Sequence, residues 1–188
     1  MEVTSAVALT ASERLLVAAD QVFYAEGIHN VPVDRVIAEA GVTRATFYRH
    51  FPGKEDLVVA YLKRRDEQIR AAAAREADDS AGPRDLLAAF VQGIIDDTCR
   101  PGFRGCPFIN AAAEYPDPEH PVRIVIAEHR RWFHGALVDL ATALQHPDPQ
   151  GAADGLAMLR DGAMVAGYLN DADQLGKRLT SAMNDILS

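Results

Sequence analysis

The sequence predicts an all-α protein of about nine helices, and three observations lead to this prediction. Apolar residues recur every three or four positions along most of the chain, which is the spacing of one helix face. Runs of alternating, β-branched residues that would indicate strands do not occur. Clusters of Pro and Gly divide the pattern into segments of helical length. We therefore expect three short helices followed by a larger helical domain.

The first helix is expected to begin after Thr10, in the stretch TASERLLVAADQVFYAEG. Thr10 and Glu13 have the spacing of a capping box, in which each side chain bonds to the backbone N–H of the other residue. Leu15, Val22 and other apolar residues form the inner stripe. Gly27 supplies the C-terminal stop, since glycine tolerates the conformation that ends a helix.

Two more short helices follow at once. Pro32 is suited to the first position of a helix with the sequence VDRVIAEA, because its missing N–H is not needed there. The turn at Gly41 comes next, and Thr43 is expected to cap a third helix that runs through Phe51. Pro52 and the glycine after it break that helix.

The rest of the chain reads as longer helices separated by Pro- and Gly-containing breaks. The expected segments are about 54–76, 85–99, a short helix after RPGFRGCP, 119–145, 150–170 and 172–187.

Composition places the chain among globular proteins. Of its 188 residues, 48% are hydrophobic and 24% charged. No apolar run approaches the roughly 18 to 20 residues that span a bilayer, and the N-terminus has no signal-peptide pattern. We therefore expect a cytoplasmic protein with no membrane partner. The formal net charge of −8 argues against indiscriminate nucleic-acid binding but leaves room for one local basic face.

Such a face is predicted on the third helix, in GVTRATFYRHFPGK. Two short helices joined by a tight turn have helix-turn-helix spacing, in which the second helix enters the DNA major groove. Phe47 and Phe51 are four residues apart and should face the core together with Val42. The other faces carry donors suited to phosphate oxygens and base edges. These residues are Thr43, Arg44, Thr46, Tyr48, Arg49 and His50, with Lys54 at the start of the next helix.

The segment from about residue 12 to residue 61 resembles the DNA-binding domain of the tetracycline-repressor (TetR) family. The matching stretch is VFYAEGIHNVPVDRVIAEAGVTRATFYRHFPGKEDLV, with its Ala-Gly-Val turn, Phe-Tyr-x-His-Phe pattern and Lys-Glu-Asp-Leu helix start. The resemblance implies a dimeric repressor or activator. It also implies a DNA-binding domain over residues 1–53 and an effector-binding, dimerising domain over residues 54–188.

The resemblance implies roles for single residues. Thr43, Arg44, Ala45 and Thr46 would lie nearest the bases, while Tyr48, His50 and Lys54 would hold phosphates. Pro32 departs from the family pattern, which commonly has Thr at the head of the second helix, so a hydroxyl contact to phosphate is in doubt there. The alternative is that this aromatic and basic face is merely solvated, in a scaffold that binds protein.

Small residues are frequent in the last two helices, where they allow close helix packing. The resemblance implies that these helices form a homodimer interface; the alternative is that the same residues serve only the core of one chain. Arg104-Gly105-Cys106-Pro107-Phe108-Ile109-Asn110 also resembles the Gly-Cys-x-x-x-Asn segment of a subset of the family.

The resemblance implies a small-molecule effector that binds among the middle helices, and such pockets are mostly apolar with a few polar groups. Plain core packing is the alternative for each candidate residue. The candidates are Phe103, Cys106, Phe108, Asn110, Glu114, Trp132, Phe133, Met158, Met164 and Tyr168.

The two cysteines, Cys99 and Cys106, are too few for a disulfide framework but open a thiol-sensing alternative. Arg100, Arg104 and a helix start at Cys106 would each favour a reactive thiolate, whereas free cysteines are commonly inert and buried.

Metal and enzyme functions are not indicated. His129 and His134 are five apart, which does not place two ligands on one helix face, and we interpret them, with His120 and His146, as solvated or capping residues. No phosphate-binding glycine loop, nucleophile elbow or carboxylate pair occurs, so we expect no enzyme and no cofactor. The resemblance to the TetR family implies a ligand-responsive regulator that binds a pseudo-palindromic operator on double-stranded DNA as a dimer. Repression with release by effector is the first hypothesis, and activation or thiol sensing is the alternative.

Overall fold

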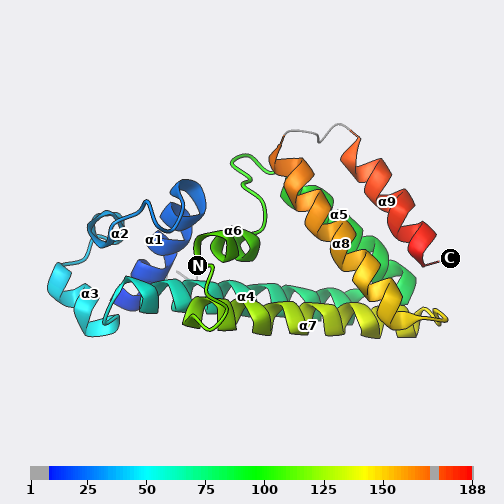
Figure 1. Cartoon of the computed structure of the whole chain (residues 1–188), viewed down its shortest axis with the longest axis horizontal. Helices are drawn as coiled ribbons and strands as arrows, with labels where there is room; N and C mark the ends of the chain where they lie inside the picture. Colours follow the sequence, from blue (N-terminus) through cyan, green and yellow to red (C-terminus); the bar gives the residue numbers. More distant parts are fainter. Residues whose placement is uncertain (1–8, 170–173, 188) are drawn as a thin grey trace, which may run out of the picture. The chain divides into compact units, whose positions relative to one another are not determined.

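The structure, a computed structural model, describes residues 9–169 and 174–187 and consists of helices joined by turns over those ranges (Figure 1). Nine helices and no strand occur in this part of the chain, which confirms the all-α prediction. They are α1 (Ala11–Glu26), α2 (Val33–Ala40), α3 (Arg44–His50), α4 (Lys54–Asp79), α5 (Pro83–Cys99), α6 (Pro107–Glu114), α7 (Pro121–Ala143), α8 (Pro149–Tyr168) and α9 (Leu175–Ile186).

The chain forms two compact units, residues 1–64 and 65–188. The division by contacts falls inside α4, whereas the sequence analysis placed the boundary between residues 53 and 54, at the start of this helix. The physical reason is that the first turns of α4 bury apolar side chains. Tyr61 is one of them, and its ring packs edge-on against Phe23 of α1 with 5.9 Å between centroids.

Local capping fixes the helices of the first unit. Thr10 and Glu13 form the expected capping box: the Glu13 N–H donates to Thr10 Oγ1 at 3.2 Å, and the Thr10 N–H donates to Glu13 Oε2 at 2.7 Å. Gly41 ends α2 with a φ of +60°, a left-handed conformation that favours glycine. Pro32 occupies the N-cap of α2 rather than its first helical position, and α3 ends at His50 with Phe51 as its C-cap.

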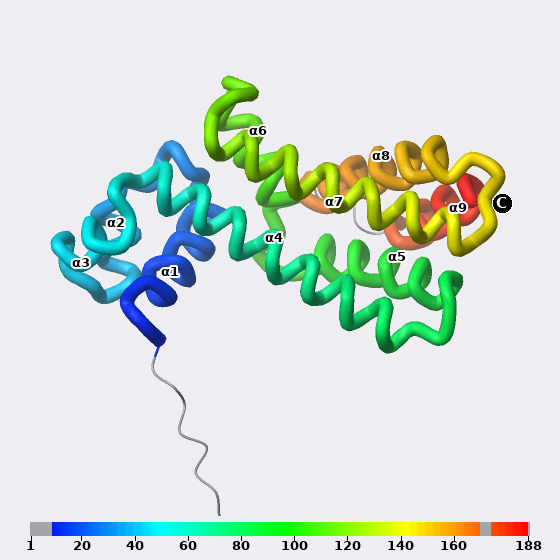
Figure 2. The backbone as a smooth tube through the Cα atoms, turned by 90° about the horizontal axis from the view of Figure 1, so that it is seen from below, coloured from blue at the N-terminus to red at the C-terminus, as the bar shows by residue number. Residues whose placement is uncertain are grey.

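The second unit is built around α8. Helices α5, α7 and α9 all pack against α8, and α5 also packs against α9 (Figure 1 and Figure 2). Most small residues of α8 lie on its inner face, where they are buried within the chain: Ala152, Ala153, Ala157, Ala163 and Gly167. This burial agrees with the alternative given above, that the small residues serve the core of one chain. Helix α7 begins at Pro121, two residues later than expected, with His120 as its cap. Part of the expected start of the last helix, 172–173, lies outside the described residues.

Candidate nucleic-acid interface and interior polar cluster

Helix α3 is anchored from beneath and capped at its start. Phe47 is fully buried, and its ring lies 6.1 Å from that of the buried Phe51. At the N-cap, Thr43 Oγ1 accepts a hydrogen bond from the Thr46 N–H at 3.1 Å, and the two hydroxyl oxygens lie 2.9 Å apart. The inward direction of both phenylalanines was predicted from their spacing and is confirmed, whereas Val42 is only half-buried.

The opposite faces of α3 are open. Thr43, Arg44, Ala45, Tyr48, Arg49 and His50 are exposed, and Thr46 is half-buried. Tyr48 packs perpendicular to Phe47 with 5.1 Å between ring centroids, which leaves its side chain half-exposed beside the helix. Exposed hydroxyl, guanidinium and imidazole groups on one short helix make a surface rich in hydrogen-bond donors.

Arg44, the first residue of α3, forms an ion pair with Asp34 in the first turn of α2. Its Nη2 atom donates to Asp34 Oδ1 at 2.6 Å and also contacts Oδ2. Both side chains are exposed. Sequence reasoning did not identify this pair, because the two residues are ten positions apart and lie on different helices.

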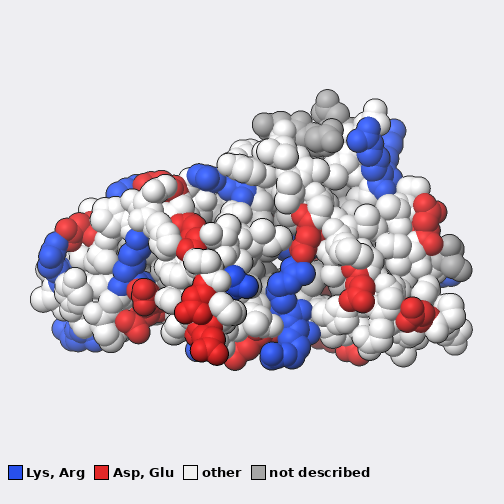
Figure 3. Space-filling model, viewed as in Figure 1, with Lys and Arg blue, Asp and Glu red and all other residues white. Residues whose placement is uncertain are grey.

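Lys54, at the start of α4, is half-buried, and its Nζ donates to the His29 carbonyl oxygen at 3.3 Å. The cation at the head of α4 therefore already contacts the segment between α1 and α2. On the face of the molecule drawn in Figure 3, basic and acidic side chains adjoin one another over the end where α2 and α3 lie. The basic charge of this end is thus interspersed with carboxylates.

The second unit contains an interior cluster centred on His129 of α7. This side chain is only 4% exposed. Its ring stacks on Phe108 of α6 with centroids 3.7 Å apart and an angle of 3°, and it lies 5.8 Å from the Trp132 ring and 6.4 Å from the Phe133 ring. Helices α6 and α7 are therefore joined by a column of flat rings.

Charged groups from α4 close this cluster on one side. Asp66 Oδ1 accepts a hydrogen bond from His129 Nδ1 at 2.7 Å, and Asp66 Oδ2 accepts one from Arg70 Nε at 2.7 Å. The Arg70 guanidinium also lies 4.6 Å above the Trp132 ring. Burial lowers the pKa of His129 below its ordinary value of 6.5, and the hydrogen bond and charge of Asp66 offset only part of this effect.

Arg160 of α8 lies on another side of the cluster. Its guanidinium lies 5.5 Å from the Phe133 ring centroid and donates a hydrogen bond to Asp161 Oδ1 at 3.1 Å. It also interacts electrostatically with Cys106. Burial lowers the pKa of Arg160, but its contacts with Cys106 and Asp161 outweigh this effect, so the pKa is raised overall. Cys106 itself is buried at the N-cap of α6, while Cys99 is exposed.

Only some of the predicted effector residues lie together. Phe108, Trp132, Phe133 and Cys106 meet through His129 and Arg160. Asn110 Nδ2 donates to the Arg104 carbonyl oxygen at 2.7 Å, so this amide holds the loop before α6.

The remaining predicted effector residues lie elsewhere in this unit. Phe103 approaches Gly167, Met164 is buried on α8, and Glu114 is half-buried at the end of α6. Tyr168 is exposed beneath the Arg104 guanidinium at 5.8 Å. Met158 is 70% exposed on the outer face of α8 and takes no part in the interior cluster.

The interpretation of the histidines was right for His120 and wrong for His129. His120 Nδ1 accepts from the Val122 N–H at 3.2 Å and caps α7, as expected. His129, by contrast, continues the buried stripe of α7 that includes Val122, Val125 and Ile126, and this helical spacing was the signal available in the sequence. Within the described ranges, no group of three or more His, Cys, Asp or Glu side chains is arranged to hold a metal ion.

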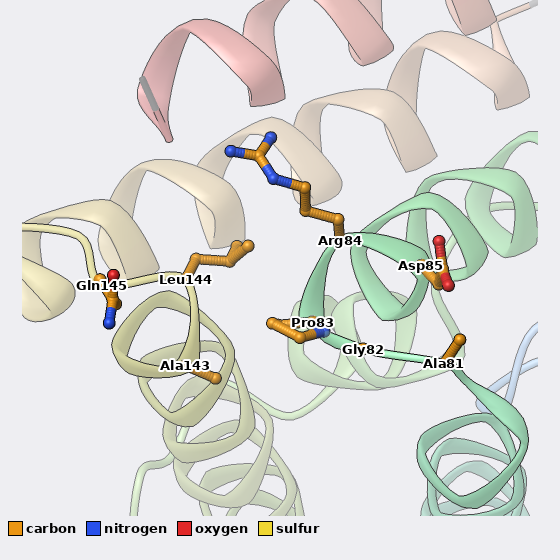
Figure 4. A pocket seen from close by; sticks show the side chains of 8 residues that line it. All are labelled: Ala81, Gly82, Pro83, Arg84, Asp85, Ala143, Leu144 and Gln145. Carbon is orange, nitrogen blue, oxygen red and sulfur yellow. The ribbon is translucent and has the colours of Figure 1, made fainter.

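An open pocket of about 400 Å³ lies between the segment that enters α5 and the end of α7 (Figure 4). It is lined by Ala81, Gly82, Pro83, Arg84, Asp85, Ala143, Leu144 and Gln145. None of the ten predicted effector residues belongs to this set. Among the described helices, none combines the length and the apolar character needed to cross a membrane.

The tight α2–α3 turn, the capped and exposed α3 and the larger helical unit define a transcription regulator of the helix-turn-helix class. The profile described as "Bacterial regulatory proteins, tetR family" matches residues 15–61. The regulator BetI of Stenotrophomonas maltophilia is 30% identical over 84% of this chain and 81% of its own length. The repressor BepR of Brucella suis is 36% identical over 91% of this chain and 84% of its own length.

Solved structures agree. SCO4454, a TetR-family transcriptional regulator from Streptomyces coelicolor, superimposes with a TM-score of 0.90 and 45% identity over 94% of each chain. The chain belongs to the TetR family of bacterial transcription regulators.

Proposed function

We propose that this regulator is a repressor that binds a pseudo-palindromic operator as a dimer and leaves it when a small molecule binds the second unit. The observation that carries this proposal is the exposed, donor-rich face of α3, held rigidly by Phe47 beneath it and by the Thr43 cap. BepR, a relative over most of the chain, is named a repressor, which supports this sign of regulation.

The residues of this face are assigned two kinds of contact. Thr43, Arg44, Ala45 and Thr46 lie at the start of α3, the part of a recognition helix that reaches base edges. Tyr48, Arg49, His50 and Lys54 are assigned to phosphates, which fix register without reading sequence. Lys54 would exchange the His29 carbonyl for a phosphate oxygen.

Selection of preferred duplexes from a random pool, using the purified full chain, tests this proposal. Tyr48→Ala should weaken binding by a similar factor on every sequence, whereas Arg44→Ala should relax preference at particular base pairs, at about 1–3 kcal/mol each. Arg131→Ala, which removes an exposed cation on α7, is the control and should change neither. Failure of the wild-type protein to enrich any sequence would refute the proposal.

The effector is proposed to bind within residues 54–188, against the ring column of Phe108, His129 and Phe133. Phe108 and His129 are stacked on each other, so the effector would displace part of this packing, and a largely apolar, aromatic molecule suits the rings it would then contact. A thermal-shift screen followed by operator-release assays tests this assignment. Because coupling is reciprocal, operator DNA must weaken effector binding by the same factor by which the effector weakens operator binding. Equal effector affinity with and without DNA would contradict the release mechanism.

Thiol sensing is the second candidate, and the electrostatic interaction of the Arg160 guanidinium with Cys106 is the observation that favours it. Positively charged neighbours are typical of cysteines that react with oxidants or electrophiles. Operator release by peroxide or a quinone should then disappear in Cys106→Ser and persist in Cys99→Ser. Unchanged release in Cys106→Ser eliminates this candidate.

A further inference from the structure

The proposed DNA-reading face contains a carboxylate that holds its arginine. Asp34 Oδ1 and Oδ2 both accept from one atom, Nη2 of Arg44. Arg35, next to Asp34, does not share in this contact, because its guanidinium pairs with Glu26 at 3.2 Å and Glu39 at 2.6 Å. Within the described residues, Arg44 and Asp34 thus have each other as their polar side-chain partner.

The Arg44 atom that Asp34 contacts, Nη2, is also one that Arg44 would use to read a base. A guanidinium offers two edges with parallel N–H donors: the end, formed by Nη1 and Nη2, and the side, formed by Nε and Nη2. Both edges require Nη2. Arginine reads guanine by donating from one such edge to O6 and N7 together. Because Nη2 has one N–H in each edge, Asp34 occupies at least one of the two edges, and a guanine that approaches that edge has to displace the carboxylate.

The competition differs between kinds of DNA. A guanine that presents O6 and N7 to Arg44 replaces both bonds to Asp34, and an exposed ion pair is weak enough to be displaced. Non-cognate DNA offers mainly phosphate oxygens, and there the carboxylate both retains Arg44 and repels the backbone. An arginine that stays paired neutralises no phosphate and releases no counterion.

We propose that Asp34 determines specificity by competing with DNA for Arg44, so that Arg44 is released at guanine in the operator and withheld from non-cognate DNA. This inference rests on the proposed role of α3 in reading the operator. It assigns Asp34 a role in discrimination against wrong sequences, since specificity is a difference between two affinities.

Asp34→Asn tests the inference, because it keeps the shape of the side chain and removes its charge. Its affinity is measured for the selected operator, for an operator changed at the base pair where Arg44→Ala relaxes preference, and for random DNA, each at several salt concentrations. We expect affinity for random DNA to rise by roughly 3- to 10-fold and operator affinity to rise less, so that discrimination falls. On random DNA, the slope of log K against log salt should steepen by about one.

Two controls separate competition from a general charge effect. Asp56→Asn removes the same charge from an exposed position in the first turn of α4 and should raise affinity for all three DNAs by similar factors. In an Arg44→Ala background, Asp34→Asn should no longer alter discrimination at the Arg44-dependent base pair. A melting temperature equal to that of the wild type shows that the variant is folded, and Asp34→Glu, which keeps the charge, should retain most of the discrimination.

The inference is overturned if Asp34→Asn and Asp56→Asn have equal effects, if Asp34→Asn lowers operator affinity, or if Arg44→Ala relaxes no position of a selected operator. The first two results leave the proposed function intact, and the third removes only the assignment of Arg44 to base contacts. If the wild-type protein selects no sequence at all, the proposed function itself fails.

Discussion

His129 is a titratable side chain in a buried, largely apolar environment, and its neighbours determine its charge. Asp66 and Arg70 approach from α4 and Arg160 from α8, so one carboxylate and two cations surround the buried ring. Burial is the largest influence and lowers the pKa of His129. A neutral imidazole that donates from Nδ1 to Asp66 fits this environment, and protonation of His129 opposes folding.

The stability of the protein should therefore fall as pH drops below about 6.5, the ordinary histidine pKa, because the unfolded chain then takes up a proton that the folded one does not. The loss cannot exceed about 1.4 kcal/mol per pH unit from this group, and it ends below the lowered pKa of the folded state. Unfolding in denaturant between pH 5 and pH 8 measures how the free energy of unfolding changes with pH. In His129→Gln the contribution of this side chain should be absent, since glutamine can donate to Asp66 without titrating.

The control for this experiment is His134→Gln, which removes a half-exposed histidine of the same helix that pairs with Asp154 at the surface. If both variants change the slope equally, the buried cluster is not its origin.

Sequence reasoning found the exposed residues of α3 but not the partners of Arg44 and His129. Spacing along one helix indicates which residues share a face, and it correctly directed Phe47 and Phe51 inward. Asp34 and Asp66 lie on helices other than those of their partners, and helical periodicity carries no information about contacts between helices.

Helix ends were predicted better than helix contacts, because caps are local. The Thr10 box, the Thr43 cap and the left-handed Gly41 depend on residues within four positions of each other. The packing of α5 against α8 depends on residues 98 and 167, which no local rule connects.

That packing gives a prediction. A Cβ atom at Gly167 of α8 would lie 2.7 Å from Thr98 Cβ and 3.2 Å from Phe103 Cε1, so Gly167→Ala should push α5 and α8 apart. We expect the free energy of unfolding to fall by about 1–3 kcal/mol, the usual cost of overpacking a core. Denaturant unfolding monitored by circular dichroism measures the change.

Gly135→Ala is the matched control. It adds the same methyl group inside α7, where nothing lies within 4 Å, and should raise the free energy of unfolding by roughly 0.5–1 kcal/mol through helix propensity alone. Equal shifts in the two variants would show that α8 tolerates the added atom and that the close approach is not needed.

An apolar stripe on the outer face of α8 has consequences for the whole protein. Met158, Val165 and Leu169 are 70%, 50% and 68% exposed, and their spacing places them on one line along the helix, opposite the buried alanines. Water-exposed apolar rows of this kind mark interaction surfaces. A second copy of the chain is the occupant that the proposed function requires, because two heads must reach major grooves about 34 Å apart.

Met158→Glu combined with Val165→Glu should therefore convert a dimer into a monomer at about 10 μM. Burying each apolar side chain in the interface contributes about 1.5–3 kcal/mol to association. A carboxylate in its place loses this contribution and adds the cost of burying an unpaired charge. Sedimentation measures the mass. Operator affinity should fall at least ~100-fold, because each head then binds its half-site alone.

Ile124→Glu is the control: it replaces a residue of α7 that is 49% exposed and lies outside the stripe, and the dimer should persist. A monomeric wild-type protein, or a double variant that remains dimeric, would remove the stripe from the interface. A monomeric wild-type protein would also leave the palindromic operator without the two-fold symmetry that explains it.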